Sequence, residues 1–125
     1  MKIAVIGLGF VGLTLSSVLA SKGIITVGID LDKEKCSKIA KGTPTFFEPN
    51  LKKTLKKALK KNLFITDKLS SINNCDFIFI TVGTPQKKNG EIDLSSIKTV
   101  VRSIGKLISK NKKKQIILVK STVIP

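Results

Sequence analysis

The sequence predicts an α/β fold in which helices cover both faces of one parallel sheet. Two observations support this prediction. Short segments rich in isoleucine and valine alternate with amphipathic segments along the chain, as in strand–helix–strand units. The length of 125 residues, without an internal repeat, is that of one domain. We therefore expect a single doubly wound domain over residues 1–125, with right-handed crossovers and the strand order 3-2-1-4-5.

Five strands are expected, and each is a short apolar run. They cover residues 2–6, 24–29, 63–66, 76–81 and 115–120. The first strand ends at Gly7 and the second at Asp30. The longest expected loop follows the fourth strand, over residues 82–93, and includes an Asn-Gly turn.

Helices are expected between the strands, where apolar residues recur at intervals of three and four. The first begins at Phe10 and is closed by Gly23. Its expected buried stripe consists of Val11, Leu15, Val18 and Leu19. The last helix follows Asp93, its expected N-cap, and its stripe consists of Ile97, Val100, Val101, Ile104 and Ile108.

Three further helical segments are lysine-rich or short. One covers residues 33–40, where Asp32 is well placed as the N-cap, and another covers residues 68–72. A third begins near residues 48–51, with a proline close to its first turn. Its apolar face consists of Leu51, Leu55, Ala58 and Leu59. The lysines between residues 52 and 61 lie opposite this face, so this basic cluster is expected to face water.

The composition argues against several function classes. The net charge is +15, but only Arg102 among the 23 basic residues is arginine, and Trp and Tyr are absent. Base recognition favours arginine and aromatic platforms, so no specific nucleic-acid partner is expected. The chain has no histidine, which removes histidine-dependent triads and Cys/His zinc sites, and no metal site is expected.

The sequence also lacks targeting features. No apolar run approaches the length of a membrane span, and the first residues do not resemble a signal peptide. We therefore expect a soluble, cytoplasmic chain without a membrane partner. In that compartment Cys36 and Cys75 are expected to be reduced apolar fillers, with a disulfide as the alternative.

A glycine-rich segment joins the first strand to the first helix. Residues 7–12 have the pattern G-x-G-x-x-G. The pattern follows an expected strand and opens an expected helix, and in this setting it indicates a dinucleotide-binding site. Gly7 is expected to form the tight turn, Gly9 to let a pyrophosphate approach, and Gly12 to allow close packing of helix on strand. The diphosphate would then meet the free N–H groups of the helix. The sequence thus predicts a Rossmann-type dinucleotide-binding domain, against the alternative of a plain tight turn.

Asp30 ends the second strand, 21 residues after Gly9. An acid at this place accepts the ribose hydroxyls of NAD and repels the 2′-phosphate of NADP, so NAD is the expected cofactor. Its alternative role is to cap the next helix, although Asp32 is better placed for that. Lys33 or Lys35 could attract a phosphate and weaken the preference for NAD.

Two hydroxyl-bearing segments are expected beside the glycine-rich segment. In doubly wound sheets the ligand lies beyond the carboxyl ends of the strands, where the strand order reverses. This places residues 82–85, which include Thr84, and the pair Ser121 and Thr122 around one cleft. Their polar groups could hold the nicotinamide ribose or orient a water, or they could cap the strand ends. The sequence leaves both roles open.

Taken together, these segments resemble the N-terminal domain of the UDP-glucose/GDP-mannose dehydrogenase family. The resemblance extends along the whole chain and rests on residues 7–12, Asp30 with Lys35, Gly42 with residues 48–51, and residues 82–85, 90–95 and 120–123. Asn50 replaces a glycine that is common in the family, and both residues tolerate a left-handed backbone.

The resemblance implies a nucleotide-sugar dehydrogenase that oxidises the C6 alcohol of a UDP-sugar to a carboxylate and reduces two NAD. The expected cofactor-binding residues are Gly7, Gly9, Phe10, Val11, Gly12, Asp30, Lys35, Gly83, Thr84, Pro85, Ser121 and Thr122. Thr122 is also similar to a threonine that helps to position the catalytic water.

By the same resemblance, the catalytic cysteine, the sugar pocket and most of the interface of a homodimeric parent belong to a further domain. We therefore expect the chain to be an isolated cofactor domain that binds NAD without turnover. An apolar patch is expected near residue 125, where the missing domain would pack.

Two other functions stay open. The N-terminal domain of a hydroxyacid dehydrogenase shares the glycine-rich segment, but residues 83–85 and 121–123 argue against it. A non-catalytic NAD-sensing or interaction module would have the same sequence features. Restoration of turnover by the missing half would separate a dehydrogenase from such a module.

Overall fold

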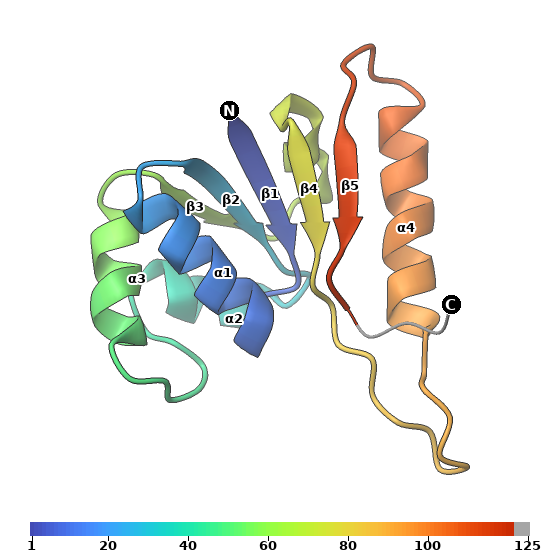
Figure 1. The fold of residues 1–125 in the computed structure, drawn as a ribbon, viewed down its shortest axis with the longest axis horizontal. Coiled ribbons are helices and arrows are strands. Elements are labelled where there is room, and N and C mark those ends of the chain that lie inside the picture. Colours follow the sequence, from blue (N-terminus) through green and yellow to red (C-terminus); the bar gives the residue numbers. More distant parts are fainter. Residues whose placement is uncertain (122–125) are drawn as a thin grey trace.

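The computed structural model describes residues 1–121, which form a five-stranded parallel sheet flanked by helices (Figure 1). The strands are β1 (Lys2–Ile6), β2 (Ile25–Ile29), β3 (Leu63–Thr66), β4 (Phe77–Ile80) and β5 (Ile116–Val119). Their order is β3-β2-β1-β4-β5, which confirms the predicted topology. β2 begins one residue later than predicted, because the N–H of Ile24 donates to the Leu19 carbonyl of the preceding helix.

The helices are α1 (Phe10–Ser21), α2 (Lys33–Ala40), α3 (Leu51–Leu59) and α4 (Ser95–Ile108), together with a 3₁₀ helix, η1 (Leu69–Asn74). Two apolar clusters define the layers. Leu13, Ile39 and Leu55 bring α1, α2 and α3 into one cluster. Ile72 of η1 and Ile104 of α4 belong to the other, with residues of β1, β2 and β4. Figure 1 accordingly shows α4 well apart from α1, α2 and α3.

The buried face of α1 differs from the predicted stripe. Val11 and Val18 are 44% and 39% exposed, so this part of the prediction is wrong. The buried residues are instead Gly12, Leu13, Ser16, Ser17 and Ala20. Apolar residues lie nearly all round this helix, so periodicity alone does not single out a face. Close approach of α1 to the sheet and to α3 selects the side with small side chains.

The other helices follow the sequence pattern more closely. In α3, Leu51, Leu55 and Ala58 are buried, as predicted, and the lysines are exposed. Asn50 precedes this helix with φ 65°, which is the left-handed conformation that its replacement of glycine implies. In α4, Ile97, Val100 and Ile104 are buried, whereas Val101 is 44% exposed.

The predicted N-caps have different outcomes. Asp32 caps α2 as expected, because its Oδ1 accepts the N–H of Lys35 at 3.0 Å. Asp93 does not occupy the N-cap position of α4, which belongs to Leu94. Asp93 Oδ1 instead accepts the N–H of Ser95, the first helical residue, at 2.9 Å.

β5 forms an edge of the sheet, and its apolar side chains are only partly covered. Ile116, Ile117 and Val119 are 56%, 40% and 47% exposed within the described part of the chain. Apolar side chains are therefore exposed on β5, whereas residue 125, near which the patch was predicted, lies outside the described residues. None of the helices within residues 1–121 has the length and apolar composition needed to cross a membrane.

Candidate cofactor-binding site

The three glycines of the first loop have three different environments. Gly7 has φ +95°, a conformation that side chains other than hydrogen rarely allow. A Cβ on Gly12 would lie 1.7 Å from the Gly7 carbonyl oxygen. Gly12 therefore has no room for a side chain, because α1 approaches the loop closely at this point. A Cβ on Gly9 would have no atom within 4 Å. The loop is therefore tightly packed at Gly7 and Gly12 and open at Gly9.

The start of α1 has no side-chain cap from the described part of the chain. Gly9 occupies the N-cap position, and no acidic residue lies in the first turn. The first N–H groups of a helix have no partner within the helix, and no side chain among residues 1–121 caps them here. Their partial positive charge lies beside the open side of Gly9, which suits an anionic group.

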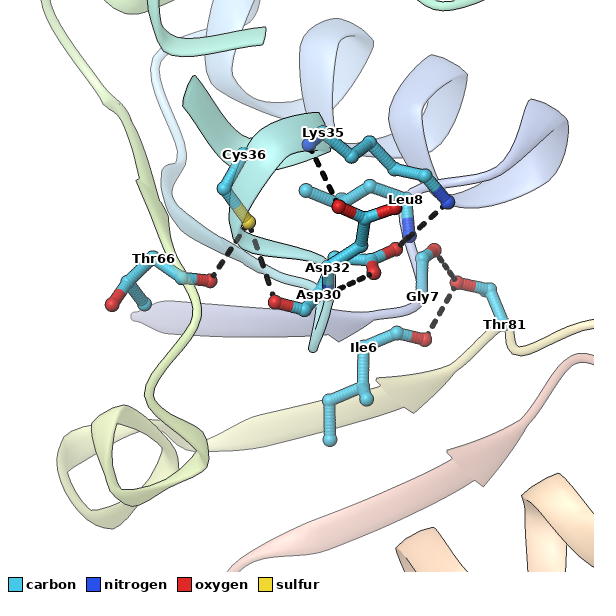
Figure 2. Close-up of polar contacts among 9 residues, drawn as sticks. All are labelled: Ile6, Gly7, Leu8, Asp30, Asp32, Lys35, Cys36, Thr66 and Thr81. Atoms are coloured by element: carbon cyan, nitrogen blue, oxygen red, sulfur yellow. Dashed lines mark hydrogen bonds and ion pairs between the residues drawn. The ribbon is translucent and has the colours of Figure 1, made fainter. Parts of the chain in front are cut away.

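Asp30 lies across the loop from this helix end (Figure 2). Its Oδ2 accepts the N–H of Leu8 at 2.8 Å and lies 3.3 Å from the Lys35 ammonium. Its Oδ1 accepts the N–H of Asp32 at 3.0 Å. Both side chains are partly shielded, with 13% of the Asp30 side chain and 30% of the Lys35 side chain exposed. Two predicted site residues, Asp30 and Lys35, therefore come together as an ion pair at the end of β2.

A cleft of about 730 Å³ opens beyond the carboxyl ends of β1, β2, β4 and β5. It lies where the predicted crevice lies, at the reversal of strand order between β1 and β4. The predicted residues that line it are Gly7, Gly9, Phe10, Val11, Asp30, Lys35, Gly83, Thr84 and Ser121. Its volume falls in the range of cofactor pockets, which is roughly 300–1,000 Å³.

Two predicted site residues, Gly12 and Pro85, do not line the cleft, and a third lies outside the described residues. Gly12 packs behind the loop, as its Cβ contact shows. The carbonyl of Pro85 accepts the N–H of Asp93 at 2.7 Å and closes the base of the loop that follows β4. Thr122 lies outside the described residues.

Ser121 caps the end of a strand in addition to lining the cleft. Its hydroxyl donates to the Val82 carbonyl at 2.7 Å, which joins the end of β5 to the end of β4. This contact is the capping alternative that the sequence left open. Gly83 and Thr84 follow Val82 directly, so the contact also fixes the segment that forms this side of the cleft.

The sequence analysis missed Thr81, which joins β4 to the glycine-rich loop. Its hydroxyl lies 2.7 Å from the Gly7 carbonyl oxygen and 3.0 Å from that of Ile6 (Figure 2). Only 8% of Thr81 is exposed, and it contributes to the floor of the cleft. A hydroxyl at the end of a buried strand was the one available signal in the sequence.

The two cysteines are free and buried within the described structure, in agreement with the interpretation as fillers. The Cys36 thiol lies 3.3 Å from the Asp30 carbonyl oxygen and 3.5 Å from that of Thr66. Burial raises the pKa of Cys36 and also that of Cys75. Neither residue lines the cleft, so neither thiol is presented to a ligand there.

Comparisons with known proteins identify the family of the chain. Residues 1–125 match the model of the UDP-glucose/GDP-mannose dehydrogenase family, NAD-binding domain. The chain is 35% identical over its full length to the GDP-mannose 6-dehydrogenase of Pseudomonas aeruginosa, of which it covers 29%. It is 38% identical over its full length to the putative UDP-glucose 6-dehydrogenase YtcA of Bacillus subtilis, of which it covers 28%.

A solved structure gives the same result. The chain superimposes with a TM-score of 0.97 and 35% identity on a ternary complex of GDP-mannose dehydrogenase from Pseudomonas aeruginosa, covering 100% of this chain and 29% of that one. The fold and cleft define a Rossmann-type dinucleotide-binding domain. The chain belongs to the UDP-glucose/GDP-mannose dehydrogenase family and corresponds to its N-terminal NAD-binding domain. It spans less than a third of the length of these relatives.

Proposed function

We propose that this chain binds the NAD of an enzyme that oxidises the C6 alcohol of a nucleotide sugar to a carboxylate, with reduction of two NAD. The observation that supports this most directly is the contrast between Gly9 and Gly12. Space is open at Gly9, beside the uncapped helix end, and filled at Gly12. A plain tight turn needs neither feature, whereas a pyrophosphate site needs both.

The positions of the residues around the cleft suggest which part of NAD each residue would contact. The start of α1 and Gly9 would hold the pyrophosphate, and Phe10 and Val11 would lie at its edge. Asp30 would accept the hydroxyls of the adenosine ribose, and Lys35 would exchange its contact with Asp30 for one to the ribose. A carboxylate offers about four acceptor positions, and three neighbouring donors already use Asp30.

The other side of the cleft would receive the nicotinamide end. Gly83, Thr84 and Ser121 lie across the cleft from Asp30, at the ends of β4 and β5. Pro85 would shape this segment from behind through its contact with Asp93. Thr122 lies outside the described residues, and its proposed role, to help to position a water, comes from the sequence resemblance alone. Bound NAD would supply the hydride acceptor for the alcohol, and the residues of this cleft would orient it.

The substrate is proposed from the relatives. A UDP-sugar is the substrate that the sequence resemblance implies. GDP-mannose is the alternative substrate, because a relative at 35% identity is named for it. The chain alone is proposed to lack turnover. Its cysteines are buried away from the cleft and it has no histidine, so neither a thiol nucleophile nor an imidazole base reaches the cofactor. A homodimeric parent protein is part of the same proposal.

Direct titration of NADH emission tests the proposal, because a chain without Trp or Tyr adds little background. NADPH is titrated beside it, at physiological and at high salt. Binding of NADH that survives high salt and exceeds that of NADPH supports the proposal. Affinity that disappears with salt would show only the attraction of phosphates to a +15 surface and would contradict it. Incubation with NAD and either UDP-glucose or GDP-mannose is expected to give no NADH.

A further inference from the structure

The peptide group between Gly7 and Leu8 is held from both sides. Its carbonyl oxygen lies 2.7 Å from the Thr81 hydroxyl, and its N–H donates to Asp30 Oδ2 at 2.8 Å. Thr81 follows β4 and Asp30 follows β2, so the two side chains reach the end of β1 from the strands on either side of it (Figure 2).

The hydroxyl of Thr81 has one proton for two nearby carbonyls. The Ile6 carbonyl already accepts the backbone N–H of Thr81 at 2.8 Å, and its distance to the hydroxyl is the longer one, 3.0 Å. The Gly7 carbonyl is therefore the acceptor that depends on the Thr81 side chain. Thr81 is 8% exposed, so water does not readily replace this contact.

The orientation of this peptide decides where the loop and α1 lie. Gly7 has φ +95°, and glycine restricts rotation of an adjacent peptide less than any other residue does. The Gly7 carbonyl oxygen also lies against Gly12, where a Cβ would approach it to 1.7 Å. A rotated peptide would therefore displace the first turn of α1, whose N–H groups face the open side of Gly9.

We propose that Thr81 is a positioning residue for NAD, which acts with Asp30 to fix the Gly7–Leu8 peptide and, through it, the pyrophosphate-binding end of α1. This rests on the proposed function, since it concerns the same cleft. The interaction is a neutral hydroxyl–carbonyl hydrogen bond, so the Thr81 hydroxyl donates its proton to the loop and acts on the cofactor through the loop. Serine supplies the same bond and alanine does not.

The test measures NADH affinity in wild-type chain, Thr81→Ala and Thr81→Ser, with Thr26→Ala as the matched control. Thr26 is also a buried threonine whose hydroxyl donates to a backbone carbonyl, that of Ile24 at 2.9 Å, and it does not line the cleft. Loss of one hydrogen bond predicts a three- to ten-fold weaker affinity in Thr81→Ala, roughly. Thr81→Ser and Thr26→Ala are expected to stay within about two-fold of wild type, by the same reasoning.

Amide hydrogen exchange at Leu8 provides a second readout that needs no cofactor. We call the two contacts of Thr81 and Asp30 to the Gly7–Leu8 peptide the clamp. Faster exchange at Leu8 in Thr81→Ala, with wild-type exchange in Thr81→Ser, supports the clamp. Unchanged exchange at Leu8 overturns the clamp, and unchanged NADH affinity in Thr81→Ala overturns its role in binding. Equal losses of affinity in Thr81→Ala and Thr26→Ala would also overturn it, because general destabilisation would explain both. Failure of the wild-type chain to bind NADH would instead refute the proposed function.

Discussion

The carboxylate of Asp30 accepts the backbone N–H of Leu8 at 2.8 Å, so the acid expected to bind ribose also holds the glycine-rich loop. Two separate segments of the dinucleotide-binding pattern are thereby joined by one hydrogen bond across neighbouring strands. The charge of Asp30 is therefore expected to affect the choice between NADH and NADPH, and its hydrogen bond is expected to affect the stability of the loop. Suitable variants can distinguish the two effects.

Asp30→Asn removes the negative charge and keeps a carbonyl oxygen that can accept the Leu8 N–H. Its preference for NADH over NADPH is expected to narrow, because repulsion of the 2′-phosphate is lost while the loop stays in place. Asp30→Ala is expected to narrow the preference and also to lower the melting temperature, since the Leu8 N–H loses its acceptor. Titration of both nucleotides and thermal unfolding measure these effects. An unchanged preference in both variants would remove Asp30 from the ribose site.

Substitution of Gly9 is expected to affect NADH binding, whereas substitution of Gly12 is expected to affect folding stability. Gly9→Val projects into open space from a backbone with φ −77°, so it is expected to retain the fold and to block NADH binding. Its free energy of unfolding is expected to fall by about 1 kcal/mol or less. Gly12→Ala forces α1 away from the Gly7 carbonyl, with an expected loss of about 1–3 kcal/mol.

Circular dichroism with urea unfolding measures the stability of both glycine variants, and NADH titration measures binding. Retained affinity in a folded Gly9→Val protein would place the ligand elsewhere. A Gly12→Ala protein as stable as wild type would contradict the close packing of α1 on the loop.

Asp76 is expected to make folding stability depend on acid pH. A hydrogen bond from the backbone N–H of Lys2, followed by one from the Lys113 ammonium, lowers the pKa of Asp76 below its usual value of 3.8. The folded chain therefore binds this proton less tightly than the unfolded chain does. The stabilising contribution is complete above pH 3.8 and is lost as the pH falls through the lower, folded-state pKa.

Urea unfolding at pH 6 and at successively lower pH values tests this dependence in wild type and Asp76→Asn. The variant is expected to lose less stability on acidification than wild type does. Asp93, whose pKa is lowered by hydrogen bonds from Ser95, contributes with the same sign and remains in both proteins. Parallel curves for the two proteins would exclude a contribution from Asp76.

Both thiols are expected to react slowly in the folded chain. Burial raises the pKa of Cys36 and Cys75, which lowers the thiolate fraction at neutral pH and shields the sulfur atoms. Alkylation with iodoacetamide, followed by mass spectrometry, is expected to be slow in buffer and fast in urea. Rapid modification of either cysteine in the folded chain would show that its site opens readily.

The sequence by itself determined the order of the elements, the parallel sheet and the location of the cleft. These follow from local patterns: apolar runs for β1 to β5, the glycine spacing of residues 7–12, and an acid at the end of β2. The left-handed backbone at Asn50 agrees with the family resemblance, in which a glycine is common at this position.

Only the tertiary structure decided which face of α1 is buried and which side chains hold the loop. The predicted stripe with Val11 and Val18 was wrong because contact with the sheet and α3, and not periodicity, selects the side with small residues. Thr81 lies 74 residues from Gly7 along the chain, and no local pattern connects them. Their hydrogen bond exists because β1 and β4 end side by side, which is a property of the folded sheet.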